Sequence, residues 1–283
     1  MSSAIRLKQE LAVALDVAES AAAEVMRLYQ AFEEIADAPA DVTTDADVAS
    51  QEIILRRLSD EFPNDRLCGE ETTAALERDR LAGKSDASRL WIVDPIDGTR
   101  GFARKNGEFS IMIGLVEQGA TVLGVVLEPA IGRLTYAVRS GGCHSRPNRD
   151  APFQQARVHS AASLADATIA MSRSRGPEGE KKLLGLLGSN RGVQTYSAGI
   201  KLAQIARGEA DVYLGDYPSM QDWDLCAGCI LVEEAGGRVT DWEGDPLKFG
   251  QSPFKQRLGL AASNGSLHAE LLTVVRKHRD AVY

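Results

Sequence analysis

Four short apolar segments follow one another between Leu90 and Ser140, and this succession constrains the fold more than any other feature of the chain. The segments are LWIVD, FSIMIGLV, TVLGVVLEP and RLTYAVRS, and the last three are separated by the turn sequences EQGA and AIG. Apolar runs of this length, bounded by short glycine-containing turns, are typical of strands joined by hairpins. The pattern therefore predicts an antiparallel meander over residues 90–140.

Helical patterns precede the predicted meander. Apolar residues recur every three or four positions in residues 4–31, which predicts one long amphipathic helix. A second helix is predicted for residues 48–62, and either Asp45 or Asp47 could cap its first turn.

After a polar loop at residues 140–152, strand-like and helix-like segments alternate as far as Trp242. The strand-like segments are ATIAMS, VQTYS, ADVYL and RVTDW, and the helix-like ones are EGEKKLLGLL, IKLAQIARG and WDLCAGCILVEEAGG. Such alternation indicates helices layered against a sheet. The predicted class is α/β (α+β), with a single domain over residues 1–283. The loop near residues 140–157 is expected to divide an N-terminal subdomain, residues 1–150, from a C-terminal subdomain, residues 151–283.

Charge and composition exclude several classes of protein. The 283 residues carry 32 Lys and Arg against 40 Asp and Glu, a net charge of −8, without a basic run interleaved with aromatic residues. This balance repels polyanions, so a nucleic acid polymer is not an expected partner, while a small phosphate ester stays open. The longest apolar run, residues 225–232, is far shorter than the roughly 20 residues that span a bilayer. Because the N-terminus also lacks the features of a secretion signal, the sequence predicts a cytoplasmic protein that is not bound to a membrane.

Several familiar motifs fail when their spacing is tested. Gly83-Lys84-Ser85 ends like a phosphate-binding P-loop, but the glycine required five positions earlier is Arg78. Cys226 and Cys229 form an isolated C-x-x-C pair inside an apolar helical run, which favours buried packing over metal binding. The four histidines are scattered and form neither a helical zinc motif nor a Ser-His-Asp set.

The informative residues are carboxylates at the ends of predicted elements. Asp94 and Asp97 flank Pro95-Ile96 in a turn that proline makes rigid, and their oxygens suit Mg²⁺. An ordinary Asp- and Gly-containing turn explains this motif equally well when it is taken alone. Glu70 follows the strand-like segment RLC, and Asp224 begins a predicted helix. Taken singly, helix capping or solvation is the better explanation for each of these two.

Taken together and in order, these segments resemble the inositol monophosphatase superfamily. They are VTTDAD at residues 42–47, GEE at 69–71, WIVDPIDGT at 91–99, WDLCAG at 223–228 and EAGG at 234–237. The resemblance covers nearly the whole chain. It implies the layered αβαβα fold of the sugar phosphatases, with the active site between two subdomains.

The resemblance also implies a metal-dependent active site with two or three Mg²⁺ ions. The implied metal ligands are Glu70, Asp94, the Ile96 carbonyl, Asp97 and Asp224. Asp47 and Thr99 match the pair that orients the attacking water and helps to remove its proton, and a capping role for Asp47 is compatible with this. The backbone N–H groups of Gly98 and Thr99 would bind the phosphate oxygens.

The implied reaction is the Mg²⁺-dependent hydrolysis of a phosphate monoester by metal-activated water. A bound divalent ion lowers the pKa of water from about 16 towards neutrality and stabilises the oxygens of an in-line displacement. A covalent phosphoenzyme is not expected, because the sequence offers no constellation around a nucleophilic Ser, Cys or His. Inhibition by lithium is expected from the family.

Within the superfamily, the segments around the meander look most like the 3'(2'),5'-bisphosphate nucleotidase branch, which removes the 3'-phosphate of adenosine 3',5'-bisphosphate. The candidate substrate-binding residues are Ser172, Arg173, Arg175, Lys201 and Asp216. Arg173, Arg175 and Lys201 would receive the second phosphate. Arg175 stands where the branch has a histidine, and the two serines that the branch has before the matching lysine are Ala198 and Gly199 here. The departures therefore fall where the leaving group would bind.

Other functions stay open at this point. Asp216 would face a polyol hydroxyl in an inositol-1-monophosphatase or another sugar or polyol phosphate phosphatase. A catalytically silent, metal-dependent binding protein could use the same scaffold, although the intact catalytic pair and metal carboxylates argue against it. Relatives include both homodimers and monomers, so a homodimer also stays open.

Overall fold

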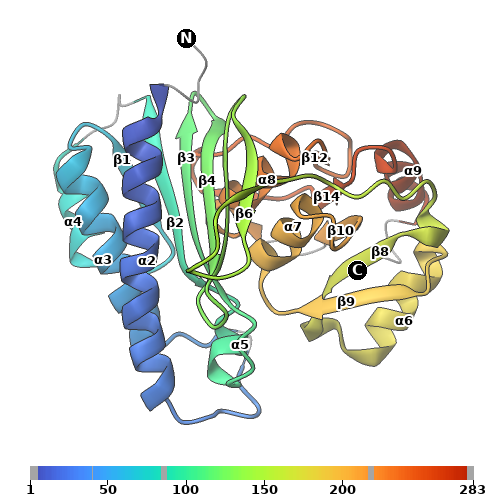
Figure 1. Ribbon diagram of the computed structural model, residues 1–283, viewed down its shortest axis with the longest axis horizontal. Helices are drawn as coiled ribbons and strands as arrows, with labels where there is room; N and C mark the ends of the chain where they lie inside the picture. The colour runs from blue at the N-terminus through green and yellow to red at the C-terminus, as the bar shows by residue number, and fades with distance from the viewer. Residues whose placement is uncertain (1–5, 40, 84–87, 216–219, 279–283) are drawn as a thin grey trace.

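The computed structural model describes residues 6–39, 41–83, 88–215 and 220–278, and its elements are drawn in Figure 1. Seven strands form the first sheet, in the order β1-β2-β3-β4-β5-β6-β7. Five strands form the second, in the order β12-β14-β10-β8-β9, while β11 and β13 pair with each other. Both large sheets lie between layers of helices, as the sequence predicts.

The first sheet contains the predicted meander. Its strands are β1 (Arg66–Gly69), β2 (Arg89–Asp97), β3 (Ser110–Glu117), β4 (Ala120–Glu128), β5 (Arg133–Val138), β6 (Gly142–Arg146) and β7 (Gln154–Ala156). β1 runs parallel to β2, and each later pair is antiparallel. The prediction of a loop at residues 140–152 is wrong for β6, which has a polar sequence and only one fully buried residue, Cys143.

The second sheet is built from the alternating C-terminal segments. Its strands are β8 (Thr168–Ser172), β9 (Arg191–Thr195), β10 (Val212–Gly215), β12 (Arg238–Thr240) and β14 (Leu260–Ser263), and the separate ribbon contains β11 (Met220–Gln221) and β13 (Lys255–Gln256). β8, β9 and β10 are parallel, as expected for strands connected by helices. The sequence patterns predict β8, β9, β10 and β12 but leave β11, β13 and β14 unassigned.

The helices form three layers (Figure 1). The outer layer on the first sheet contains α2 (Lys8–Ala31), α3 (Asp45–Glu61) and α4 (Ala74–Leu81). The layer between the sheets contains α7 (Ala198–Ala206) and α8 (Asp222–Glu234), and the far layer contains α6 (Gly176–Leu187) and α9 (His268–Lys277). Short helical turns occur at α5 (Thr99–Ala103), η1 (Leu164–Asp166) and η2 (Arg173–Arg175). The αβαβα arrangement is thereby confirmed, although α4 and α9 had no predicted counterpart.

The helix predicted for residues 48–62 begins earlier than expected, at Asp45. Its N-cap is neither Asp45 nor Asp47 but Thr44, whose side chain accepts a hydrogen bond from the backbone of Ala46. The Asp47 carboxylate completes a capping box by accepting the backbone N–H of Thr44. A capping box satisfies two otherwise unpaired N–H groups at the start of a helix.

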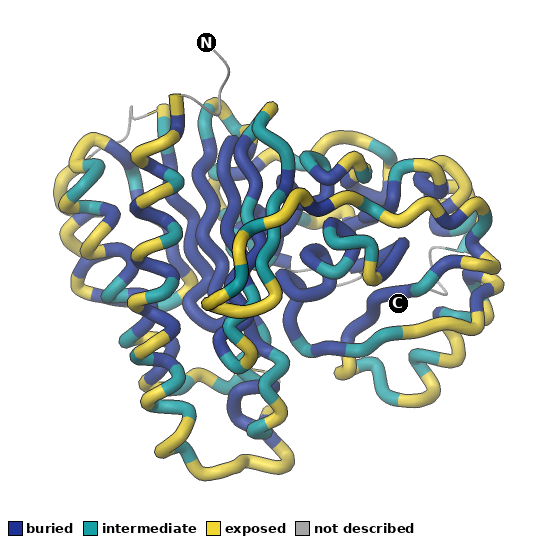
Figure 2. Tube along the Cα trace, in the orientation of Figure 1, coloured by how far each residue is buried: buried dark blue, intermediate teal, exposed yellow. Residues whose placement is uncertain are grey.

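Burial is concentrated in the central strands of the first sheet and in the helices between the sheets (Figure 2). Gly114 on β3 and Gly124 on β4 are cross-strand partners. A Cβ atom at Gly114 would collide with the Cys226 sulfur, and one at Gly124 with the backbone of Ala227. These two glycines therefore let α8 lie directly on the sheet.

The cysteines behave as predicted. Cys226 and Cys229 are buried free thiols on α8, and burial raises the pKa of both. Both side chains pack in the core.

Two further predictions concern the whole chain. None of the helices within the described residues is long and apolar enough to cross a membrane. The first sheet ends at Ala156 and the second begins at Thr168. The chain thus changes sheet within the linker that follows β7, and the division into two subdomains at residue 150 stays a prediction.

Candidate active site

All the predicted metal ligands line one pocket of about 330 Å³. The residues around it are Glu70, Asp94, Ile96, Asp97, Gly98, Thr99, Arg100, Ser172, Ser174, Tyr196, Ala198, Lys201, Tyr213, Met220 and Asp224. They come from the end of β1, the end of β2, α5, the η2 turn, β10, β11 and the first turns of α7 and α8. The pocket therefore collects segments that are far apart in the sequence.

The turn after β2 displays its side chains through an irregular backbone. The pairing of β2 with β3 shifts register between Asp94 and Asp97, so the chain bulges there. Gly98 then adopts a φ of 89°, and a Cβ atom on it would lie only 2.8 Å from the Glu108 carbonyl oxygen and 3.0 Å from the Ser197 nitrogen. Glycine is thus required at this position both for the positive φ and for the close approach of two backbones.

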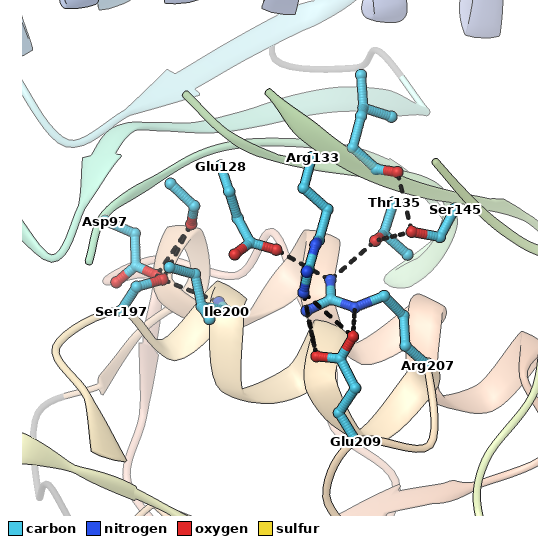
Figure 3. Close-up of polar contacts among 11 residues, drawn as sticks. Asp97, Glu128, Arg133, Thr135, Ser145, Ser197, Ile200, Arg207 and Glu209 are labelled. Atoms are coloured by element: carbon cyan, nitrogen blue, oxygen red, sulfur yellow. Dashed lines mark hydrogen bonds and ion pairs between the residues drawn. The ribbon is translucent and has the colours of Figure 1, made fainter. Parts of the chain in front are cut away.

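One oxygen of Asp97 is held by the start of α7. Asp97 Oδ2 accepts hydrogen bonds from the Ser197 hydroxyl and, at 2.6 Å, from the backbone N–H of Gly199. The Ser110 hydroxyl lies 3.4 Å from the same oxygen. Figure 3 shows Ser197 directed at Asp97. A backbone hydrogen bond from Ala198 adds to these contacts, so the start of α7 fixes the Asp97 carboxylate.

The other end of α7 is also tied to the first sheet. Arg207, immediately after the helix, pairs with Glu128 at 3.0 Å and donates a hydrogen bond to the Thr135 hydroxyl at 3.1 Å (Figure 3). Arg207 and Glu128 are both almost fully buried. With Ser197 bound to Asp97 at one end and Arg207 bound to Glu128 at the other, α7 is held rigidly against the pocket.

Asp47 reaches the pocket through Thr99. The Thr99 hydroxyl lies 3.1 Å from Asp47 Oδ1 and 3.0 Å from the Ile96 carbonyl oxygen. Asp47 Oδ2 accepts the backbone N–H and the hydroxyl of Thr44, at 2.8 Å and 2.6 Å. The two oxygens of Asp47 thus have separate partners, one in the helix cap and one at the pocket.

The carboxyl groups of the pocket have raised pKa values, so their ionised forms are disfavoured. Burial raises the pKa of Asp94 well above its usual value, and the charges of Glu70, Asp97 and Asp224 raise it further. Burial likewise raises the pKa of Asp224 to about 7 and that of Asp47 to about 6. Burial of the carboxyl group also raises the pKa of Glu70 to about 8, although Glu70 as a whole residue is exposed. Such a cluster of anions is relieved by a cation.

The donor set fits a hard divalent cation, because every side-chain ligand in it is a carboxylate oxygen. Within the described residues, no three Asp, Glu, His or Cys side chains converge closely enough to enclose an ion by themselves. Mg²⁺ keeps several waters in its coordination shell and is bound directly by few protein groups. The carboxylates share one pocket but do not surround a common point. This arrangement suits an ion that keeps part of its water shell.

Lys201 places a buried ammonium group in the wall of this acidic pocket. Its Nζ donates hydrogen bonds to the carbonyl oxygens of Thr195 and Tyr196, both at 3.2 Å, and lies 5.2 Å from the centre of the Tyr213 ring. Burial raises the pKa of Asp97, and the Lys201 charge opposes that rise. Lys201 therefore compensates part of the negative charge.

The other predicted substrate-binding residues are placed differently. Ser172 lines the pocket and caps the η2 turn. Arg173 and Arg175 lie in that turn but are not among the pocket-lining residues, and Arg173 forms an ion pair with Glu108. Asp216 lies outside the described residues.

The sequence patterns missed Arg100, Ser174 and Tyr196, which also line the pocket. For Arg100 a signal existed, because it directly follows Thr99 in the Asp94–Thr99 motif. Ser174 lies in the segment Ser172–Ser174, which resembles a segment of the nucleotidase branch, but only Ser172 and Arg173 of that segment were predicted to bind substrate. Tyr196 carries no motif, and its contact with Arg100 is visible only in the structure.

The comparisons with known proteins agree with this arrangement. The inositol monophosphatase family matches residues 6–280. A histidinol-phosphatase of Mycobacterium tuberculosis is 32% identical over 270 residues, covering 93% of this chain and 96% of that protein. The 3'(2'),5'-bisphosphate nucleotidase CysQ of Salmonella typhimurium is 33% identical over 211 residues, covering 73% of this chain and 78% of that protein.

Among solved structures, an inositol monophosphatase from Anabaena has a TM-score of 0.76 at 25% identity, covering 96% of this chain and 97% of that one. The family match spans nearly the whole chain and includes every segment that builds the pocket. The protein therefore belongs to the inositol monophosphatase family of metal-dependent phosphoric monoester hydrolases.

Proposed function

We propose that the pocket hydrolyses a small phosphate monoester with Mg²⁺ and that water attacks the phosphorus directly. The observation that carries this proposal is the convergence of four carboxylates and the Asp47–Thr99 pair on one pocket. In this proposal Glu70, Asp94, Asp97, Asp224 and the Ile96 carbonyl hold two or three Mg²⁺ ions. When bound, Mg²⁺ supplies Lewis-acid stabilisation of the phosphate oxygens and lowers the pKa of water.

Asp47 and Thr99 act on the proton of the attacking water. Thr99 Oγ1 lies between Asp47 Oδ1 and the pocket, so its hydroxyl orients the water and passes a proton to the carboxylate. Burial raises the pKa of Asp47 to about 6. This value suits a base working near neutral pH, because general bases are most effective when their pKa lies close to the operating pH.

The phosphate group is held by the turn that follows Asp97. The positive φ of Gly98 turns the backbone sharply before α5, and the N–H groups of Gly98 and Thr99 would bind the phosphate oxygens. The same turn carries Asp97 and Thr99, so the phosphate lies beside the proposed metal ligands and the residue that orients the water.

Adenosine 3',5'-bisphosphate is the substrate that the pocket supports best. Lys201 is a fixed cation in the pocket wall, and Ser172 also lines the pocket, which suits a leaving group that carries a second phosphate. The similarity to a bisphosphate nucleotidase supports the same substrate class. Inositol phosphate is an alternative on the similarity to the Anabaena inositol monophosphatase.

Histidinol phosphate is the second candidate substrate. The histidinol-phosphatase of M. tuberculosis matches more of the chain, 93% against 73% for the nucleotidase. The ammonium and imidazole groups of histidinol would, however, meet the positive charge of Lys201, which favours the nucleotide.

Phosphate release tests this proposal. The kcat/KM is measured with Mg²⁺ for adenosine 3',5'-bisphosphate, histidinol phosphate, inositol 1-phosphate and fructose 1,6-bisphosphate, with EDTA and lithium as controls. A preference for the nucleotide of more than about tenfold, some 1.4 kcal/mol in the transition state, is expected. A preference for another ester would replace the nucleotide in the proposal, and the absence of Mg²⁺-dependent release from all four would overturn it.

A further inference from the structure

The wall of the pocket contains a second cation, Arg100, which directly follows Thr99 in α5. Contacts link Arg100 to other lining residues on this second side of the pocket: Arg100 contacts Ser174 and the Tyr196 ring, and the Tyr196 carbonyl oxygen accepts a hydrogen bond from Lys201. A phosphate ester bound through its phosphate at the turn beside Thr99 would extend its leaving group past this second side.

The hydrogen bonds of Arg100 leave its charge uncompensated. Nε donates to the Ala38 carbonyl oxygen and Nη1 to the Ser174 hydroxyl, both at 3.1 Å. Both partners are neutral, and within the described part of the chain no carboxylate pairs with Arg100. A guanidinium has five N–H donors, so three remain for another partner.

Arg173 differs from Arg100 in this respect. It donates from Nε to Glu108 at 2.8 Å, forms a second bond from Nη2 to the other oxygen of the same carboxylate, and also contacts Gln194. Its charge is therefore neutralised by a two-point ion pair with Glu108. Of the two arginines, Arg100 is the one that both faces the pocket and lacks a carboxylate partner.

Tyr196 keeps the Arg100 guanidinium in place. The Arg100 Cζ lies 5.4 Å from the centre of the Tyr196 ring, and the Tyr196 hydroxyl accepts a hydrogen bond of 2.6 Å from Arg104 Nη1. Stacking on an aromatic ring and hydrogen bonds to Ala38 and Ser174 restrict the rotamers of Arg100 before any ligand arrives. Preorganisation of this kind lowers the entropy cost of binding.

We propose that Arg100 is the specificity-determining residue that binds a second anionic group on the leaving side of the substrate, such as the 5'-phosphate of adenosine 3',5'-bisphosphate. This inference rests on the phosphomonoesterase function proposed above. Arginine suits the role because its planar donors bind phosphate at two points. It replaces Arg173 and Arg175 as the partner of the second phosphate.

The test compares two substrates that differ only in the second phosphate. Wild-type protein and Arg100→Ala, Arg100→Lys and Ser174→Ala variants are assayed with adenosine 3',5'-bisphosphate and with adenosine 3'-monophosphate. A substitution that disturbs the whole site lowers kcat/KM for both substrates by the same factor, so this loss cancels in the ratio of the two values. Arg191→Ala is the matched control, because Arg191 is exposed. Within the described residues, its side chain donates a hydrogen bond only to the Asp166 carbonyl oxygen.

In the wild type, the bisphosphate is expected to have the higher kcat/KM. Arg100→Ala is expected to reduce the ratio of bisphosphate to monophosphate about tenfold or more, mainly through KM, since a charge-assisted hydrogen bond contributes about 1.5–3 kcal/mol. Arg100→Lys should retain part of the preference. Ser174→Ala removes a contact that restrains Arg100 but leaves its charge, so it should reduce the ratio less than Arg100→Ala does. The control Arg191→Ala should change the ratio less than threefold.

Two results would overturn the inference while leaving the phosphatase intact. One is a wild-type enzyme that hydrolyses both adenosine substrates with equal kcat/KM. The other is an Arg100→Ala variant that loses the same factor on both, because Arg100 would then act on the phosphate that the two substrates share. Failure to hydrolyse either ester with Mg²⁺ would instead contradict the proposed function.

Discussion

The Thr99 hydroxyl lies 3.1 Å from Asp47 Oδ1, and this contact joins two residues 52 positions apart, one on the first turn of α3 and the other on the first turn of α5. Both are fixed from the other side as well. Asp47 is held by the helix cap of Thr44, and Thr99 by the Ile96 carbonyl. The pair therefore has one geometry available at the pocket wall.

Thr99→Ala should lower kcat by about a hundredfold or more, because the hydroxyl that links the attacking water to Asp47 is lost. Binding of Mg²⁺, measured by its effect on the melting temperature, should change little, since the Thr99 side chain is not among the proposed ligands. Thr99→Ser keeps the hydroxyl and should retain most of the activity. A loss of Mg²⁺ binding as large as the loss of turnover would show that Thr99 is part of the metal site.

Ser197→Ala removes a contact with the Ser110 hydroxyl and two contacts that matter for the site, the hydrogen bond to Asp97 and the N-cap that accepts the backbone N–H of Ile200 at 2.9 Å. The lost cap should cost about 1 kcal/mol of stability. The loosened Asp97 should raise the Mg²⁺ concentration needed for half-maximal activity by several fold, whereas kcat at saturating Mg²⁺ falls less. Ser197→Thr preserves both contacts and serves as the control. Unchanged Mg²⁺ dependence in the alanine variant would mean that the other contacts of Asp97, with Gly199 and Ser110, are enough to position it.

Stability and Mg²⁺ binding should depend on pH in opposite ways. Burial raises the pKa of Asp47 from 3.8 to about 6 and that of Asp224 to about 7. Between about pH 4 and pH 7 the metal-free folded protein thus holds more protons at these groups than the unfolded chain, so their contribution to stability falls as the pH rises. Mg²⁺ requires the deprotonated carboxylates, and its binding strengthens over the same range.

The rise in melting temperature on adding Mg²⁺ is therefore expected to be small at pH 5 and large at pH 8. This difference is insensitive to titrating groups far from the site, because they act equally with and without the metal. A shift of equal size at both pH values would contradict the assignment of Asp224 as a metal ligand.

The fold was predictable wherever burial left a regular pattern in the sequence. The strands of the meander are nearly continuous apolar runs because α2 and α3 cover one face of the sheet and α8 covers the other. β6 escaped prediction because three of its five residues are polar and another is glycine, and α4 because it is short and highly charged. β14 has small residues and lies between β10 and β12, so its assignment depends on neighbours that are distant in sequence.

The candidate site divides in the same way. A local motif suffices to identify the residues that one turn presents together. They all lie within residues 94–99, namely Asp94, Ile96, Asp97, Gly98 and Thr99. The substrate side depends on packing instead: Tyr196 and Ser174 meet Arg100 only because α7 and η2 are packed beside α5. Arg173 was a reasonable candidate from its charge, but its ion pair with Glu108, 65 positions away, has no local signature.

The most direct test of the central claim is phosphate release by the wild type and the Asp94→Asn variant, each with saturating Mg²⁺ and with EDTA. Asparagine keeps an oxygen to accept the backbone N–H of Ile96, which lies 3.1 Å from Asp94 Oδ1, so the turn should persist. The wild type should release phosphate only with Mg²⁺, and the variant should lose at least about a hundredfold in kcat/KM, equivalent to about 2.7 kcal/mol. Wild-type turnover that is unaffected by EDTA, or a folded Asp94→Asn variant with full activity, would contradict the account.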